Sequence, residues 1–181
     1  VPETFPKLSE PITAFIGKNY QETAFGVLSS FLSDYPAEDL RACVDKAYDA
    51  KFEDPSIAPL VRAGGAYFLV LYHGSTAAFK DMALSILPHL LTTAMRLTQE
   101  DRRIAILTAT SGDTGKAALA GFADVPGTEI IVFYPEEGVS QVQKRQMTTQ
   151  EGANVHVFGI RGNFDDAQAG VKRLVSDAAF S

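Results

Sequence analysis

The chain has 181 residues, of which 46% are hydrophobic and 21% are charged, and its formal net charge is −6. This apolar content supports a sizeable core and disfavours disorder. The lack of a basic field disfavours nucleic acid and anionic membrane surfaces, so we expect neither as a partner. A small anionic substrate is still compatible with the acidic balance, because a local pocket can oppose the global sign.

Cys43 is the one cysteine, which excludes a disulfide framework and fits a reducing, cytoplasmic environment. The surrounding DLRACVDKAY has a helical pattern, and we expect Cys43 to be a small buried residue rather than a nucleophile. One cysteine and three histidines show no metal-ligand spacing, so no metal site is expected. No apolar run approaches the ~20 residues that span a bilayer, and no signal peptide is visible.

The first third of the chain is predicted to be helical. One helix is expected in QETAFGVLSSFLSDYP, ending at Pro36, and a second in AEDLRACVDKAYDA, which has acidic residues in its first turn. The second helix carries an apolar stripe of Leu40, Val44, Ala47 and Tyr48. Residues 51–66 are rich in proline and glycine and are predicted to be a loop. An N-terminal helical region over residues 1–66 follows from these patterns.

The remainder, residues 67–181, changes rhythm and is predicted to be an α/β region. YFLVLY (67–72) is a candidate strand, and a long helical pattern follows it, in which Pro88 should cause a kink or begin a new segment. Three strand–helix units come next, at 103–110 with 116–123, 129–135 with 139–152, and 154–160 with 164–179. Their strands are continuously apolar, which predicts a parallel sheet with helices on both faces.

The turn SGDTG joins the first of these strands to its helix. Ligands of open parallel sheets bind beyond the carboxyl ends of the strands, which is where this turn falls. Gly112 and Gly115 allow close backbone approach, Ser111 or Asp113 can cap the helix, and the free N–H groups of the helix start can face an anion. Capping alone would also explain these residue types, because any strand-to-helix turn favours them. The turn is neither a P-loop nor GxGxxG.

Lys80 begins the helix that follows HGST in YHGSTAAFKD. We expect its stem to lie beside the apolar face that starts at Phe79, where a partly dry site would release the ammonium proton and leave a nucleophilic amine. The alternative is an ordinary solvated lysine at a helix start. Lysine is nevertheless unfavourable in a first helical turn, whereas the acidic Asp81 beside it suits that position. His73 is either polar lining of a site or a satisfied histidine at a strand end.

Two segments together carry a family resemblance. YHGSTAAFKD, followed some thirty residues later by LTATSGDTGKAAL, resembles threonine synthase, a pyridoxal-phosphate enzyme of the β-family, or fold type II. VFYPEEGVSQVQKRQMTT and NVHVFGIRGNFDDAQAGVK extend the similarity over nearly the whole chain. The resemblance implies that Lys80 holds pyridoxal phosphate covalently. It further implies that the cofactor is contacted by Ser111, Gly112, Asp113, Thr114 and Gly115, with His73, Ser75, Thr76 and Thr110 lining the substrate.

The same resemblance implies a reaction, the conversion of O-phospho-L-homoserine and water to L-threonine and phosphate. Two alternatives stay open: a related phospho-lyase that releases 2-oxobutyrate, and a non-catalytic α/β module. Ser75 stands where the family usually has proline, which leaves the loop geometry less determined. Lys116, Lys144 and Arg145 are candidates to grip the substrate phosphate, although we favour their interpretation as solvated helix charges.

The ends of the sequence lead to one further expectation. The chain starts at Val1 rather than at a methionine and stops at Ser181 inside a helical pattern, so we expect a fragment of a longer protein. The family's glycine-rich cradle for the cofactor phosphate has no counterpart here. We therefore expect the 181 residues alone to bind cofactor weakly, to be inactive, and to self-associate through surface that the complete enzyme would cover.

Overall fold

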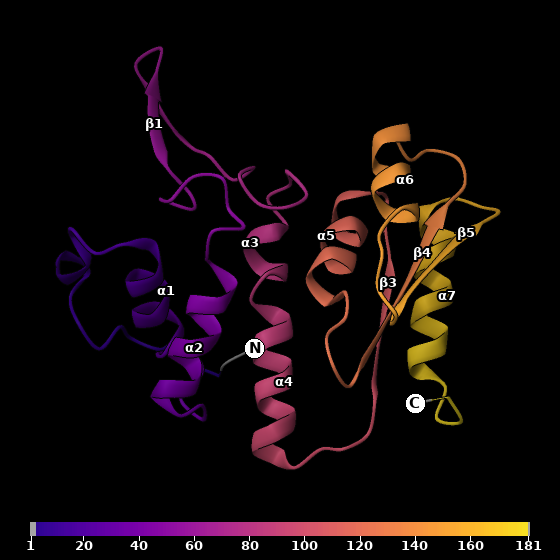
Figure 1. Cartoon of the computed structure of the whole chain (residues 1–181), viewed down its shortest axis with the longest axis horizontal. Coiled ribbons are helices and arrows are strands. Elements are labelled where there is room, and N and C mark those ends of the chain that lie inside the picture. Colours follow the sequence, from indigo (N-terminus) through magenta and orange to yellow (C-terminus); the bar gives the residue numbers. More distant parts are fainter. Residues whose placement is uncertain (1–2, 181) are drawn as a thin grey trace.

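The computed structural model describes residues 3–180 and has two parts that lie side by side (Figure 1). Helices fill one part and an α/β unit fills the other, with α3 and α5 facing each other between them. The first part consists of η1 (Ile12–Phe15), α1 (Tyr20–Leu28), α2 (Ala37–Ala47), β1 (Leu60–Ala63), β2 (Ala66–Leu69), α3 (Asp81–Leu84) and α4 (Leu87–Thr98). The second consists of β3 (Ile104–Ala109), α5 (Asp113–Phe122), β4 (Thr128–Pro135), α6 (Gln141–Thr148), β5 (Val155–Ile160) and α7 (Phe164–Ser176).

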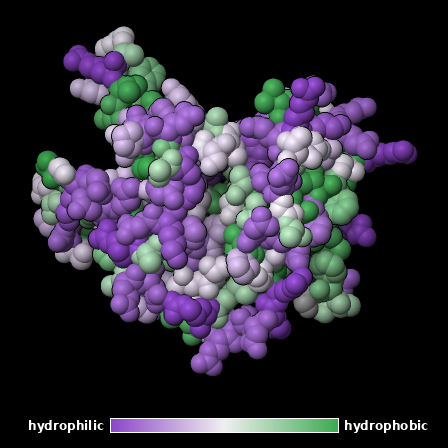
Figure 2. All heavy atoms as spheres, viewed as in Figure 1, coloured by the Kyte–Doolittle hydropathy of each residue, from purple (hydrophilic) through white to green (hydrophobic). Residues whose placement is uncertain are grey.

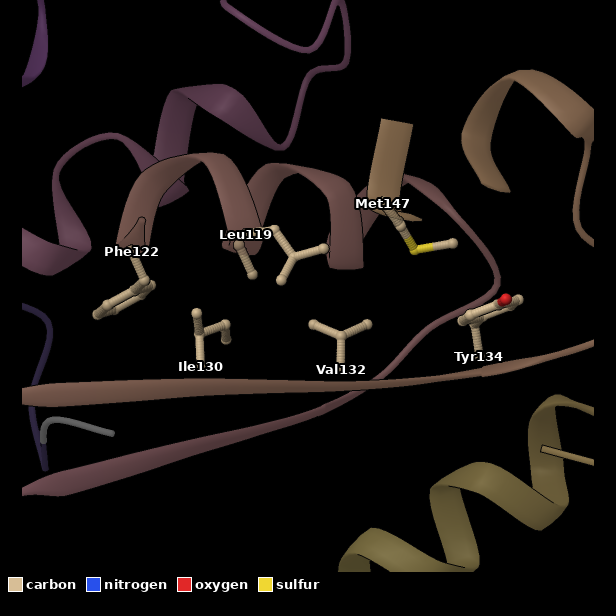
Figure 3. Packing of buried hydrophobic residues seen from close by; sticks show 7 residues of the cluster. Leu119, Phe122, Ile130, Val132, Tyr134 and Met147 are labelled. Carbon is tan, nitrogen blue, oxygen red and sulfur yellow. The ribbon is translucent and has the colours of Figure 1, made fainter. Parts of the chain in front are cut away.

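The three strands of the second part form a parallel sheet in the order β3-β4-β5. Ile106 pairs with Ile130, and Val132 pairs with Val157 across the next ladder. Helices α5 and α7 cover opposite faces of the sheet (Figures 1 and 3). The predicted α/β class, with helices on both faces of a parallel sheet and helices at the N-terminus, is therefore confirmed.

The core of the α/β unit lies between α5 and β4. Leu119 and Phe122 point from α5 toward the sheet, where they meet Ile130 and Val132, while Met147 reaches the same layer from α6 (Figure 3). These side chains are at most 1% exposed. Alternate residues of β4 are fully buried, because its other face is only partly covered by α7.

A second apolar cluster holds the helical part together. It contains Val44, Ala47 and Tyr48 of the α2 segment, which pack with Ile57 and Ile86. The predicted α2 stripe is thus confirmed, and so is the burial of Cys43, which is 2% exposed and lies 3.3 Å from Thr93 Oγ1.

Three predicted boundaries are wrong. Helix α1 ends at Leu28 and not at Pro36, because the chain makes tighter turn hydrogen bonds after Ser29. Helix α6 ends at Thr148, four residues before Gly152. The apolar face expected to start at Phe79 does not begin there, because Phe79 is 55% exposed.

The predicted loop at 51–66 and strand at 67–72 are both corrected by an antiparallel hairpin of β1 and β2. Gly64 and Gly65 form its two-residue turn with φ of +57° and +81°, a left-handed geometry that glycine adopts without strain. Residues 60–69 are all exposed, and the hairpin projects from the body (Figures 1 and 2). The apolar pattern predicted a strand here, but the strand pairs with its neighbour in the hairpin and is not part of the parallel sheet.

Pro88 begins a new segment, as predicted. It occupies the first turn of α4, where its missing N–H has no intrahelical acceptor to lose. The joint between α3 and α4 packs directly on α5 at Gly121, where an added Cβ would lie 2.4 Å from the carbonyl oxygen of Leu84. No side chain larger than hydrogen fits at Gly121 without separating the two parts.

No helix among residues 3–180 is both long and apolar enough to cross a membrane. Within the same residues, no group of three or more potential metal ligands comes together.

Truncating the core should destabilise the α/β unit. Leu119 is completely buried against β4, so Leu119→Ala should lower the free energy of unfolding by about 3 kcal/mol through lost burial and a residual cavity. Urea unfolding followed by circular dichroism measures the loss. Leu97→Ala, at a position 38% exposed, is the matched control and should cost less than about 1 kcal/mol. Equal losses for the two variants would contradict the packing described here.

Candidate functional site

The loop HGST is held by a buried carboxylate. Asp81, 4% exposed, accepts a hydrogen bond from the Thr76 backbone N–H at 2.8 Å and another from Thr76 Oγ1 at 2.6 Å. Gly74 lies against the same carboxylate, and a Cβ there would lie 2.6 Å from Asp81 Oδ2. Sequence reasoning placed Asp81 only as a helix-start acid and missed this role, because the bond depends on how the loop folds back.

Lys80 occupies the N-cap position of α3, one residue before the first helical turn. Asp81 takes the first-turn position that an acid prefers, whereas Lys80 stands at the helix N-terminus, where the dipole disfavours a cation. The side chain is half-buried, and Nζ lies 4.8 Å from the centre of the Phe79 ring. Its two neighbours in sequence lie in different environments, because Phe79 is an exposed ring and Asp81 a buried carboxylate.

The SGDTG turn is organised by the residue that precedes it. Thr110, 1% exposed, accepts hydrogen bonds at Oγ1 from the backbone N–H groups of Gly112 and Gly115, each at 2.9 Å. Helix α5 has Gly112 as its N-cap and no side-chain cap there, so the prediction that Ser111 or Asp113 caps it is wrong. Ser111 is exposed and does not cap the helix. A threonine hydroxyl upstream satisfies the two donors instead.

The turn also depends on two glycines for close packing. Gly112 has φ of +145°, and a Cβ there would lie 2.4 Å from the side-chain amide of Gln143. At Gly115 a Cβ would lie 2.4 Å from the Thr110 methyl group. The first intrahelical bond of α5 runs from the Lys116 N–H to Gly112 O at 3.1 Å, which leaves the N–H groups of Asp113 and Thr114 ahead of it.

Asp113 connects this turn to two neighbours. Its Oδ1 accepts a hydrogen bond from Gln143 Nε2 at 2.8 Å and lies 3.2 Å from Lys116 Nζ. The Gln143 hydrogen bond, with the charges of Lys116 and Lys80, lowers the pKa of Asp113 below its ordinary value. Because the Lys80 charge contributes, the YHGSTAAFKD lysine and the SGDTG turn lie within electrostatic reach, although 33 residues separate them.

Lys116 is not a solvated helix charge, contrary to one of the two readings. The residue is 8% exposed and its ion pair with Asp113 bridges one turn of α5. Arg145 is exposed, whereas Lys144 is half-buried with Nζ 5.8 Å from the centre of the Tyr134 ring. A cavity of about 530 Å³ runs beside Lys116 and is lined also by Ser75, Thr76 and Gln146.

His73 does not match one of the two roles expected for it, that of a satisfied histidine at a strand end. It is half-buried and its ring is tilted against that of Tyr72, with 4.9 Å between ring centres, but strand β2 ends four residues earlier. Its Nδ1 is buried without a hydrogen-bond partner among residues 3–180, so the structure does not show a satisfied histidine at a strand end.

These features suit a phosphorylated aldehyde cofactor. Lys80 lies at the start of α3, which packs on α5, and the glycine turn at the start of α5 has its Cβ positions already filled by neighbours. First-turn N–H groups of α5 offer donors to an anionic or hydroxyl group. Fold and site together define an α/β protein with a lysine placed beside a glycine-rich helix start.

Comparison with known proteins specifies that class. A family model described as pyridoxal-phosphate dependent enzyme matches residues 55–180, and one described as threonine synthase N terminus matches residues 1–48. The chain belongs to the pyridoxal-phosphate dependent enzyme family. The expected cofactor, pyridoxal phosphate, and the resemblance to threonine synthase are thereby confirmed.

Individual relatives agree. Threonine synthase of Pseudomonas aeruginosa is 40% identical over 99% of this chain, and human threonine synthase-like 1 is 34% identical over 98%. The crystal structure of pyridoxal-phosphate-bound threonine synthase from Brucella melitensis superposes with a TM-score of 0.87 at 39% identity, covering 99% of this chain and 39% of that one. This chain spans 38% of the Pseudomonas protein and 25% of the human protein.

The hydroxyl of Thr110 should be essential to the turn. Thr110→Val keeps the shape but leaves the buried N–H groups of Gly112 and Gly115 unsatisfied, and should lower the free energy of unfolding by about 1–3 kcal/mol. Thr110→Ser keeps the hydroxyl and should lose less. Chemical denaturation of the three proteins measures the difference. A valine variant as stable as the parent would show that the hydroxyl does not organise this turn.

Proposed function

We propose that this chain is the N-terminal part of a threonine synthase, a cytoplasmic carbon–oxygen lyase acting on phosphates. The enzyme converts O-phospho-L-homoserine and water to L-threonine and phosphate. The observation that carries the proposal is the contact of α3 with α5, which brings the start of α3, with Lys80, within electrostatic reach of Asp113 at the start of α5. In this proposal residues 67–181 form the cofactor-binding region and residues 1–66 the helical region that precedes it.

Lys80 would hold pyridoxal phosphate through its amine, beside the turn formed by residues 111–115. When bound, this cofactor stabilises negative charge at the substrate carbons next to its point of attachment. Thr114 and the first-turn N–H groups of α5 would orient the substrate carboxylate or the ring hydroxyl side. His73, Ser75, Thr76 and Thr110 line the substrate side in this proposal.

The reaction requires protons to move at three carbons. The γ-carbon loses phosphate and gains a proton, and the β-carbon gains the water oxygen. Lys80 Nζ, once released from the cofactor, is the group that would take and return protons at the α- and β-carbons. Asp81 supports this amine indirectly, because its hydrogen bonds to Thr76 fix the loop that leads into α3.

A second function stays open. It is a related phospho-lyase that converts O-phospho-L-homoserine and water to 2-oxobutyrate, ammonia and phosphate, and proteins named threonine synthase-like 1 match the chain at 34% identity. Both reactions need the same lysine and cofactor, and they differ in whether water adds at the β-carbon or releases the amine as ammonia. The decisive measurement is therefore the identity of the products.

Replacing Lys80 should abolish the chemistry. The full-length protein, supplied with pyridoxal phosphate and O-phospho-L-homoserine, should form threonine and phosphate, and Lys80→Ala should reduce the rate by at least about 10³-fold. Mass spectrometry and a phosphate assay measure the products, and circular dichroism checks the fold. Appearance of 2-oxobutyrate would establish the phospho-lyase instead. Bound cofactor without phosphate release would leave the lysine assignment standing but make the substrate wrong, whereas no cofactor uptake would favour a non-catalytic module.

The 181 residues alone should bind cofactor weakly and form no threonine, which the same assays test.

The exposed hairpin should drive self-association of the 181-residue chain. The hairpin projects from the body (Figure 2), and four of its side chains are each more than half exposed: Leu60, Tyr67, Phe68 and Leu69. Among residues 3–180, neither edge of this two-stranded sheet pairs with another strand. Static light scattering at high concentration should show dimers or larger species, and Phe68→Ser should shift them toward the monomer. Ile16→Ser, at an apolar position 80% exposed outside the hairpin, is the control. A strictly monomeric parent chain would refute the proposal.

A further inference from the structure

The side-chain amide of Gln143 serves two elements at once. Its oxygen accepts hydrogen bonds from Ser140 Oγ at 2.8 Å and from the Ser140 backbone N–H at 3.4 Å. The second of these completes the capping box of α6, in which the Gln143 N–H donates to Ser140 Oγ at 3.2 Å. Its nitrogen donates to Asp113 Oδ1 at 2.8 Å in the SGDTG turn. The start of α6 is thus tied to the start of α5 through one side chain.

Glutamine, unlike glutamate, can both close the capping box and donate a hydrogen bond to Asp113. Glutamate and glutamine both close a capping box, so helix capping alone does not require an amide. A glutamate at position 143 would place a second carboxylate against Asp113, whereas glutamine offers a donor to it. Gly112 supports the same contact, because any Cβ there would collide with the Gln143 amide.

Two cations act on the Asp113 carboxylate that Gln143 binds. Lys116 from the same helix and Lys80 from the start of α3 are the two cations that act on it, and both Gln143 and Lys116 meet Oδ1. The carboxylate is therefore oriented by one neutral donor and one buried cation. Removing the neutral donor leaves the ion pair with Lys116 free to draw the carboxylate back along α5.

We propose that Gln143 is a positioning residue, which orients the Asp113 carboxylate and thereby sets the SGDTG turn for pyridoxal phosphate. The role of the turn rests on the proposed function, whereas the bond between the two side chains does not. Gln143 itself need not touch cofactor or substrate. Its effect passes through Asp113 and through the packing of its amide on Gly112.

Two variants separate positioning from helix capping. Gln143→Ala removes both duties, whereas Ser140→Ala weakens the capping box and leaves the Asp113 bond in place. Gln143→Glu keeps the cap but loses the donor unless the pair shares a proton. Gln141→Ala, at an exposed position in the same helix, is the matched control.

The first measurement needs no cofactor. Carbon-13 NMR titration of labelled aspartates in the 181-residue chain should give a higher Asp113 pKa in Gln143→Ala and a still higher one in Gln143→Glu, with Ser140→Ala and Gln141→Ala unchanged. The second uses the full-length protein and the visible absorption of bound pyridoxal phosphate. Gln143→Ala should weaken cofactor binding about tenfold, the cost of one hydrogen bond to a charged group, and Gln143→Glu should bind better at low pH than at high pH.

Each outcome bears on the proposal. An Asp113 pKa that is the same in Gln143→Ala and the parent overturns it, as does cofactor binding weakened equally by Ser140→Ala. Normal cofactor binding in Gln143→Ala would also overturn the positioning role. A parent protein that takes up no cofactor refutes the proposed function instead, and the NMR titration then still decides whether the side-chain bond exists.

Discussion

The close approach of the α3–α4 joint to α5 is the contact on which the site depends. Gly121 makes it possible, because its missing side chain admits the carbonyl oxygen of Leu84. This contact sets Lys80 at the start of α3 within electrostatic reach of Asp113 at the start of α5. It also joins the helical part to the α/β unit, so the packing that holds the two parts together is the packing that assembles the site.

Buried polar atoms then determine the local geometry on each side of that contact. Thr110 satisfies two N–H groups of the glycine turn, and Asp81 accepts the N–H and the hydroxyl of Thr76 in the loop before Lys80. Both are among the most buried polar residues of the chain. An unsatisfied buried donor or acceptor costs more than a typical hydrogen bond contributes, so each arrangement is strongly preferred over nearby alternatives. The flexible-looking segments HGST and SGDTG are therefore rigidly placed.

The surface has a different character. The hairpin of β1 and β2 exposes apolar side chains and unpaired backbone groups, which monomeric proteins usually avoid. These features are consistent with a chain that spans 38% of the length of its Pseudomonas relative. The exposed apolar side chains of the hairpin are the reason for the proposal that the 181-residue chain self-associates.

Local patterns in the sequence were sufficient for much of the fold. Continuous apolar runs indicated β3, β4 and β5, the alternating helices indicated parallel pairing, and Pro88 indicated a break, because each depends on neighbours within one element. The two motifs named Lys80 and residues 111–115 as candidates for the site. Tertiary structure alone decided which atoms satisfy one another. The hydroxyl of Thr110, the carboxylate of Asp81, the burial of Lys116 and the reach of Gln143 across 30 residues to Asp113 carry no periodic signal. Hydrogen bonds between distant segments depend on the angle and separation at which whole elements pack, and no single element encodes either quantity.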